Sequence, residues 1–220
     1  MALLMLAALA MPVCGQQTAE EWNNKGNALY NQGKYAEAIL AYDEAIRLDP
    51  ELAMAWSNKG SALGIQAKYD ESIRCLNEAI RLDPEYVDAW YNKALDLADQ
   101  GKYDESIEAY DEAIRLDPGY VMAWSNKGSV LGIQGKYDEA ILAFDEAIRL
   151  YPEFTMAWYN KGVALGIQGK YADAILAYDE AIRLDPEYVD AWNNKGEALE
   201  SLGRTSEANA AYAKARELGL

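Results

Sequence analysis

Apolar and small residues recur along this chain at the spacing of one helix face, and the whole pattern returns every thirty-four residues. In one copy, Trp158, Gly162 and Leu165 fall on the same side of a helix when each residue turns by about 100°. A second set with the same spacing runs from Tyr171 to Ile182. The pattern predicts two helices in each repeat, and no β-type alternation competes with it.

Residues that stop a helix stand at the ends of these segments. Gly101, in the sequence Gly-Lys-Tyr, can adopt the left-handed conformation that ends the first helix without a Cβ penalty. Proline lacks an amide hydrogen and pushes the preceding residue out of helical space, so each proline is expected to end a second helix. The prolines at these repeat junctions are Pro50, Pro84, Pro118, Pro152 and Pro186.

A Trp-x-Asn-Lys-Gly segment, with one close variant, counts the repeats, because every tryptophan of the chain begins one. A period of this length indicates stacked helix pairs, each unable to bury its apolar face alone. The tryptophans are Trp22, Trp56, Trp90, Trp124, Trp158 and Trp192. The repeat array, residues 19–220, is therefore divided into the units 19–52, 53–86, 87–120, 121–154, 155–188 and 189–220.

The chain from Ala19 to Leu220 resembles the tetratricopeptide repeat family. The resemblance rests on Trp at the fourth position of each repeat, mostly Gly at the eighth, Ala or Ser at the twentieth, mostly an aromatic residue at the twenty-fourth and Pro at the thirty-second. It implies an all-α fold, a right-handed α-solenoid of six helix-turn-helix repeats, whose first helices line a concave groove for partner proteins or extended peptides. The last repeat departs from the pattern at Thr205 and Asn209, which indicates a water-compatible cap.

The first residues stand outside the repeats. Met1 to Val13 form an apolar run with a small-x-small site at Ala8-Leu9-Ala10, so residues 1–17 are interpreted as a signal peptide or hydrophobic leader. No Lys or Arg precedes Leu3, which leaves two readings open. One is an exported or cell-envelope protein, and the other is a cytoplasmic protein. A lipidated Cys14 is a weaker alternative, and membrane contact is expected only through an uncleaved leader.

Composition and charge narrow the function classes. The net charge of −16 argues against a nucleic-acid partner, because phosphate binding needs clustered Lys and Arg. The chain has no histidine and only two cysteines, of which Cys75 is expected to be a buried free thiol, so no metal site or cofactor is expected. Adjacent carboxylates such as Asp43 and Glu44 point about 100° apart on a helix and cannot converge on a substrate. No catalytic residue is assigned, and the chain is not expected to be an enzyme.

The sixth position of each repeat is the first candidate binding position, because helical geometry places it opposite the Trp-Gly-Leu face. An amide side chain can pair with a peptide unit of any sequence, so a regular ladder could hold an extended backbone. The alternative is that each amide bonds a neighbouring repeat. The residues are Asn24, Asn58, Asn92, Asn126, Asn160 and Asn194.

The positions beside these asparagines vary between repeats. They predict an apolar floor in repeats four and five, formed by Met122, Met156 and Val163 and flanked by Tyr159, between acidic stretches that include Asp88 and Asp190. The expected ligand is an extended segment of a protein or peptide with apolar anchors and basic flanks. For Ile133 and Ile167, the alternative remains open that these side chains pack between adjacent first helices.

The regular Lys and Arg residues are expected on solvated faces, where ion pairs at helical spacing contribute little. No Lys or Arg stands at the second, fifth or sixth position, so the carboxylate clamp that holds a chaperone tail in other family members is not expected. The sequence predicts a non-catalytic protein-interaction scaffold. A self-assembling structural solenoid and an accessory domain of an enzyme complex remain as alternatives.

Overall fold

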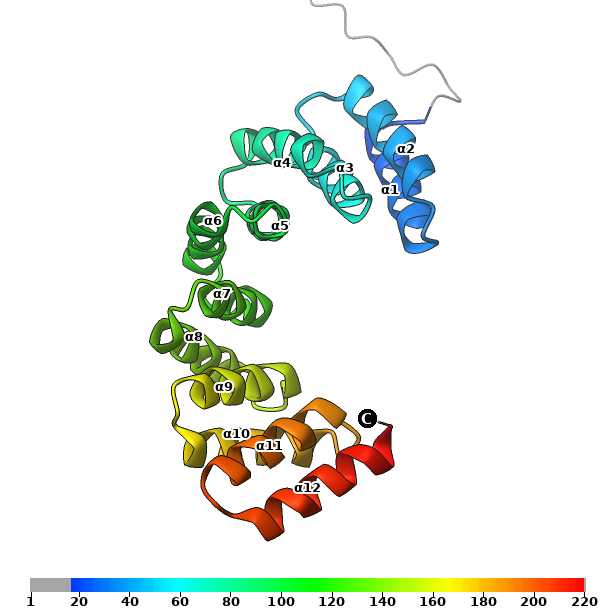
Figure 1. Ribbon diagram of the computed structural model, residues 1–220. Coiled ribbons are helices and arrows are strands. Elements are labelled where there is room, and N and C mark those ends of the chain that lie inside the picture. The colour runs from blue at the N-terminus through cyan, green and yellow to red at the C-terminus, as the bar shows by residue number, and fades with distance from the viewer. Residues whose placement is uncertain (1–16, 220) are drawn as a thin grey trace, which may run out of the picture. The chain divides into compact units, whose positions relative to one another are not determined.

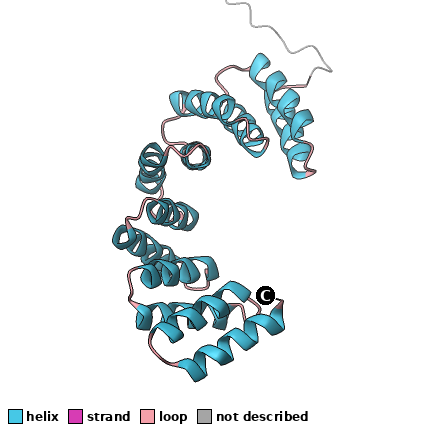
Figure 2. Ribbon diagram, in the orientation of Figure 1, coloured by secondary structure: helices cyan, strands magenta, loops and turns pink. Residues whose placement is uncertain are grey.

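The computed structural model describes residues 17–219 and divides into two compact units, one within the first 84 residues and one from residue 85 onward. The leader, Cys14 and Leu220 lie outside the described residues. Twelve helices and no strand are found in the described part of the chain, which confirms the all-α prediction (Figure 2).

Each predicted repeat forms one pair of helices (Figure 1). The first unit holds α1 (Ala19–Asn31), α2 (Tyr35–Leu48), α3 (Ala53–Ile65) and α4 (Tyr69–Leu82). The second unit holds α5 (Val87–Asp99), α6 (Tyr103–Leu116), α7 (Val121–Ile133), α8 (Tyr137–Leu150), α9 (Thr155–Ile167), α10 (Tyr171–Leu184), α11 (Val189–Ser201) and α12 (Thr205–Leu218). Odd-numbered helices are the first helices of their repeats and even-numbered helices are the second.

The turn inside each pair uses the left-handed backbone that the glycine pattern predicts. Gly101 has a φ of +75°, and the equivalent glycines of the other repeats lie between +73° and +77°. The second repeat has Ala67 at this position, with a φ of +57°. It is the one non-glycine residue with positive φ in the described chain.

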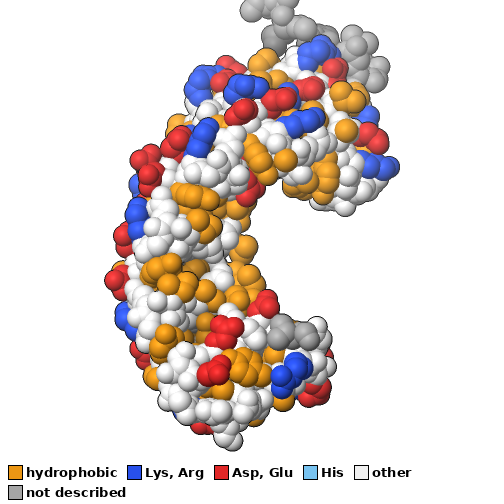
Figure 3. Space-filling model, viewed as in Figure 1, with side chains coloured by type: hydrophobic (Ala, Val, Ile, Leu, Met, Phe, Trp, Pro, Cys, Tyr) orange, Lys and Arg blue, Asp and Glu red, His pale blue; other side chains and the backbone are white. Residues whose placement is uncertain are grey.

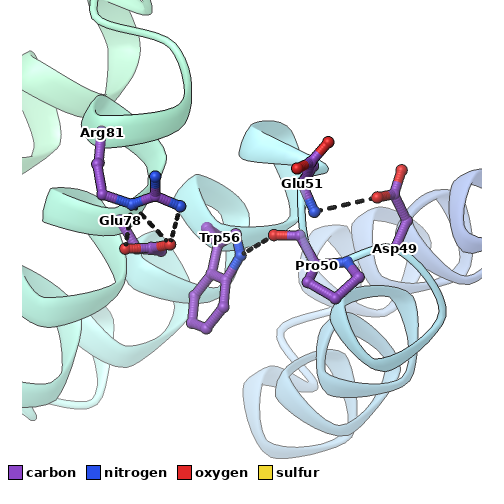
Figure 4. Close-up of polar contacts among 6 residues, drawn as sticks. All are labelled: Asp49, Pro50, Glu51, Trp56, Glu78 and Arg81. Atoms are coloured by element: carbon purple, nitrogen blue, oxygen red, sulfur yellow. Dashed lines mark hydrogen bonds and ion pairs between the residues drawn. The ribbon is translucent and has the colours of Figure 1, made fainter.

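A tryptophan of the following helix forms a hydrogen bond at the junction between two helix pairs. The Trp56 indole Nε1–H donates to the carbonyl oxygen of Pro50 at 3.0 Å, and the Asp49 carboxylate accepts the amide of Glu51 at 3.0 Å (Figure 4). Equivalent indole bonds join Trp124 to Pro118, Trp158 to Pro152 and Trp192 to Pro186, at 2.9–3.1 Å. The proline therefore ends one helix and also supplies the acceptor that orients the next helix.

Small residues allow the two helices of a pair to approach closely. A Cβ added to Gly128 would lie 2.7 Å from Cε1 of Phe144, so this aromatic ring occupies the space that a side chain would need. Ser72 and Ser106 stand where other repeats carry Ala. Their buried hydroxyls donate to carbonyl oxygens of the paired first helix at 2.7 Å, which satisfies both polar groups.

The lysines at the sixteenth position of the repeat, such as Lys136, are exposed as expected, but most of those at the seventh position are not. The Lys161 side chain is only 22% exposed, and its ammonium lies 2.6 Å from Asp145 on α8 and 5.5 Å from the centre of the Trp158 ring. This lysine therefore links one repeat to the previous one. The same link joins Lys59 to Asp43, Lys127 to Asp111 and Lys195 to Asp179. The Arg–Glu pairs at i,i+3 spacing, such as Arg149 with Glu146, do lie at the surface.

The last helix buries a narrow face. Of α12, only Ala208, Ala211 and Ala215 are buried, and its surface carries an exposed ion pair between Lys214 and Glu217. Gly219 ends it in the left-handed conformation.

Candidate functional site

Three of the six repeated asparagines bond the preceding repeat. The Asn126 side-chain amide donates to the phenol oxygen of Tyr91 at 2.9 Å, and that of Asn194 donates to Tyr159 at 3.1 Å. The Asn58 amide donates to the side-chain oxygens of Asn23 and Asn27, both at 3.0 Å. For these three positions the geometry matches the alternative of bonding within the array.

Asn24 and Asn160 differ from this pattern. Asn24 is exposed on α1, and Asn92 is half-buried on α5. Asn160 is half-buried on α9, and among the described residues its amide has no hydrogen-bond partner. Asn126 and Asn194 bond the tyrosine at the fifth position of the preceding repeat. For Asn160, the residue at that position of the preceding repeat is Ser125. Serine is too short to supply the acceptor that the tyrosines supply.

Asn160 lines an apolar hollow between α7 and α9. The hollow has a volume of about 270 Å³ and is bordered by Ile133 and Phe144 on one side and by Val163 and Ile167 on the other. Ile133 is 64% exposed and Ile167 is 58% exposed, so neither side chain is buried by packing between the helices. Figure 3 shows hydrophobic side chains gathered over α7 to α9.

A helical glycine keeps this hollow open. Gly132 lines it on α7, and a Cβ added there would meet no atom within 4 Å. This differs from Gly128, where a Cβ would collide with Phe144. Gly128 serves helix packing, whereas Gly132 leaves free volume beside Asn160.

A second, more polar hollow adjoins the first along the same face. It lies between α9 and α11, has a volume of about 310 Å³, and shares Val163 and Ile167 with the apolar hollow. Asn194, Glu197 and Ser201 of α11 form its polar side. A ligand that crosses from α7 to α11 would therefore meet an apolar site and then an acidic one.

Tyr159 borders this region and is held in place by its neighbours. Its ring lies 4.8 Å from that of Tyr188 and 6.1 Å from that of Tyr178, measured between ring centroids. Burial raises the pKa of Tyr159, the charge of Asp190 raises it further, and the hydrogen bond from Asn194 lowers it. The phenol is therefore neutral at ordinary pH, and since its oxygen accepts from Asn194, its own O–H remains available as a donor.

The two methionines of the predicted apolar floor lie at the surface. Met122 is 43% exposed at the start of α7, and Met156 is 47% exposed at the start of α9. The Tyr188 hydroxyl lies 3.3 Å from the sulfur of Met156. Flexible thioether side chains at such positions can adapt to the shape of a bound segment.

Asp88 and Asp190 occupy the same repeat position as these methionines, in the first turns of α5 and α11. An acidic side chain there interacts favourably with the helix N-terminus, so both have a structural role independent of any ligand. Asp88 also accepts a hydrogen bond from Tyr120 at 3.2 Å, and both aspartates are exposed. The first turns of α7 and α9 contain no acidic residue.

The first unit has a different hollow in the equivalent place. Between α1 and α3, a hollow of about 310 Å³ is lined by Asn27, Asn31 and Asn58 together with Tyr30 and Tyr42. The Tyr42 hydroxyl donates to Asn27 at 2.8 Å, and Asn58 is already bonded, so this hollow is polar and internally satisfied. The apolar hollow with an unbonded amide belongs to the second unit.

Among residues 17–219, no group of three or more His, Cys, Asp and Glu side chains lies close enough to hold a metal ion. The adjacent carboxylates Asp43 and Glu44 point in different directions. Asp43 forms an ion pair with Lys59 of the next repeat, and Glu44 forms one with Arg47 of its own helix. Cys75 is a buried free thiol, as predicted, and burial raises its pKa. No helix of the described chain combines the length and apolar character needed to cross a membrane.

The roles of Ser125 and Gly132 were missed by the sequence analysis, although both leave a signal. The fifth position reads Asn23, Ser57, Tyr91, Ser125, Tyr159 and Asn193 along the chain. Where tyrosine stands, the next repeat's asparagine is bonded, and after Ser125 it is not. Comparison of the fifth and sixth positions in consecutive repeats could have marked Asn160, together with Asn92, which follows Ser57.

Models of the tetratricopeptide repeat match residues 19–52 and, in overlapping windows, residues 58–121, 91–153, 126–186 and 159–219. No curated protein sequence matches the chain. Solved structures similar to it include MamA, at 26% identity and a TM-score of 0.70, covering 72% of this chain and 93% of that chain.

Two further structures extend the comparison. YrrB, described as a tetratricopeptide repeat protein with an unusual peptide-binding site, is 25% identical, with a TM-score of 0.67 and coverage of 79% of this chain and 89% of that chain. PilW, a type IV pilus biogenesis factor, has a TM-score of 0.79 over 90% of this chain and 92% of that chain, and at 19% identity it shows the fold alone. Because the repeat models span almost all of residues 19–219, the chain belongs to the tetratricopeptide repeat family.

Proposed function

We propose that this protein is a non-catalytic scaffold that binds an extended segment of another protein along the first helices of repeats four to six. The observation that carries the proposal is the apolar hollow between α7 and α9, where the Asn160 amide has no partner. Exposed apolar surface of this kind is typical of interaction sites, and an unbonded amide at its edge can pair with a peptide unit.

The chemistry of the two adjoining hollows defines the expected ligand. An apolar side chain would occupy the space between Ile133 and Ile167, and its backbone would pair with Asn160. The next part of the segment would meet Glu197 and, nearby, Asp190, so a Lys or Arg is favoured there. The proposed ligand has an apolar anchor and a basic flank, and an acidic chaperone tail or a nucleic acid is excluded by charge.

The likeness to YrrB supports a peptide ligand, because that protein is described as having an unusual peptide-binding site. For this chain the proposal is limited to the first-helix face of the second unit. Export to the cell envelope is proposed on the apolar run at the start of the sequence alone, and fractionation of the native cells would test it.

Asn160 and Asn126 provide a matched pair of variants for testing the site. We expect Asn160→Ala to weaken binding of a partner captured from the native source by roughly tenfold, since a buried polar contact is lost. Asn126→Ala should change the affinity little, because its amide already bonds Tyr91. Affinities would be measured by calorimetry with purified proteins.

Gly132→Leu provides a second, independent test. The new side chain would fill the hollow without meeting another atom at its Cβ, and leucine is a better helix former than glycine. We expect folded, helical protein that binds the same partner more than about tenfold less tightly. Ile65→Ser, at the position equivalent to Ile133 in the first unit, is the control and should bind normally. Equal affinities for wild type, Asn160→Ala and Gly132→Leu would refute the proposed site.

A further inference from the structure

Two leucines on the second helices of neighbouring repeats lie largely exposed. Leu142 on α8 is 67% exposed and Leu176 on α10 is 65% exposed. They hold the same position in consecutive repeats, and the repeats on either side carry Glu108 and Ala210 there. Within the second unit, the pair of exposed leucines is confined to repeats four and five.

Leu176 also borders a groove between α8 and α10. The groove has a volume of about 690 Å³, larger than either hollow of the first-helix face. Trp158 and Leu165 of α9 contribute apolar surface to it, together with Ile141 of α8. An amphipathic helix could therefore bury an apolar face here against residues from three helices.

The rim of this groove is acidic. Asp145, Asp173, Asp179 and Glu180 all line it, and Lys161 is the one cation among the described lining residues. Asp145 is paired with Lys161, Asp179 with Lys195 and Glu180 with Arg183, whereas Asp173 has no ion pair in the described chain. Asp173 is therefore the rim carboxylate left without a cation, and it favours a basic partner.

The equivalent groove in the first unit provides an internal comparison. It is lined by Trp56, Lys59 and Leu63, which correspond to Trp158, Lys161 and Leu165. Arg74 stands there in place of Leu176. That groove thus lacks the equivalent of Leu176 and gains a positive charge, although Leu40 on α2 is exposed at the position of Leu142. Two leucines at this position in consecutive repeats are found in the second unit.

We propose that the groove between α8 and α10, together with Leu142, is a second docking surface, which takes a basic amphipathic helix of another protein. The apolar face of that helix covers Leu142 and Leu176, and its Lys or Arg side chains approach Asp173. Helices pack side chains into the grooves of neighbouring helices in this way. A second copy of this chain fits poorly, because its net charge of −16 would oppose the acidic rim. The surface is separate from the first-helix face, so the proposal does not depend on the function proposed above.

Photo-crosslinking in the native cells tests the surface directly. A benzophenone amino acid is placed at position 142, and at position 74 as the matched control in the first unit. We expect position 142 to form an adduct with another protein, at a Lys- or Arg-containing amphipathic segment, that position 74 does not form. The partner is then purified and its affinity measured against the full chain.

Substitution of both leucines tests whether they contribute to the affinity for this partner. Leu142→Ser plus Leu176→Ser should keep its helical content, since both side chains are exposed, and should bind about tenfold more weakly or worse. Gly132→Leu, which blocks the other face, should leave this affinity unchanged. Three crosslinking results would overturn the proposal: adducts only between two copies of this chain, no adduct specific to position 142, or a crosslinked segment that is acidic. Binding of the double serine variant with the same affinity as the wild type would also overturn it.

Discussion

At the scale of the residue, a single turn position shows how backbone conformation limits side-chain choice. Glycine adopts the left-handed conformation at no steric cost, whereas an L-residue loses roughly 1–2 kcal/mol there. Ala67 occupies this conformation in the second repeat, at a φ of +57°. The second repeat therefore contains local strain that the equivalent turns, such as that at Gly101, do not have.

Ala67→Gly is expected to raise the free energy of unfolding by about 0.5–1 kcal/mol, because relief of the strain exceeds the extra entropy that glycine gives the unfolded chain. Gly101→Ala should lower it by a similar amount. Urea unfolding followed by circular dichroism measures both variants. A loss of stability in Ala67→Gly would mean that the entropy of the unfolded chain outweighs the strain.

Single residues also show where sequence reasoning reached its limit. The six asparagines are identical in sequence position, and the periodicity places all six in the same direction on their helices. Their roles differ because Tyr91 and Tyr159 reach the next repeat and Ser125 does not. The direction of a side chain follows from its own helix, but its hydrogen-bond partner depends on the neighbouring one.

At the scale of the element, the links between helices are made by charged residues as much as by apolar ones. Lys161 of α9 contacts Asp145 of α8 and lies over Trp158, whose indole bonds Pro152 at the junction between the two helices. A partly buried ion pair is less screened by solvent than an exposed one, and a cation near an aromatic face adds to it. These contacts orient one repeat against the next.

A double-mutant cycle can measure this link. For Lys161→Met and Asp145→Asn we expect a coupling energy of about 0.5–1.5 kcal/mol in the unfolding free energy, because the lysine is mostly withdrawn from solvent. The control is the exposed i,i+3 pair of Arg149 and Glu146, for which a coupling below about 0.5 kcal/mol is expected. Equal couplings in the two cycles would show that the Lys161 pair contributes no more than a surface pair.

The elements themselves were predictable from the sequence, and the contacts between repeats were not. Glycine and proline mark the helix ends through local backbone restrictions, so positions such as Gly101 and Pro118 needed no knowledge of packing. The partnership of Lys161 with Asp145 spans two repeats and depends on how their helices lie against each other. Periodicity within a helix contains no such information.

At the scale of the whole molecule, the large exposed apolar side chains of the second unit lie mostly in the fourth and fifth repeats, on both the first and the second helices. Ile133 and Ile167 lie on the first helices, and Leu142 and Leu176 lie on the second helices. Acidic residues border both regions, in a chain with a net charge of −16. One stretch of the second unit therefore combines two separate surfaces suited to basic partners, which fits a scaffold that holds two proteins at once.

Buried tyrosines make both units sensitive to alkaline pH. Burial raises the pKa of Tyr42 in the first unit and of Tyr188 in the second to about 12, and it raises the pKa of Tyr110 and Tyr178 further. An unfolded tyrosine titrates near pH 10. Because the folded pKa is the higher one, the stability that these groups contribute is complete below about pH 10 and is lost as the pH rises through 12.

We therefore expect helical circular dichroism to stay constant up to about pH 10 and to fall above it, together with a late rise in tyrosinate absorbance from the buried phenols. Exposed tyrosines should titrate first, while the helices are intact. Tyr178→Phe removes one such group without losing the ring that fills the space beside Gly162, so its helix loss should shift to higher pH. Titration of every tyrosine near pH 10 with the helices still formed would contradict the expected burial of these rings.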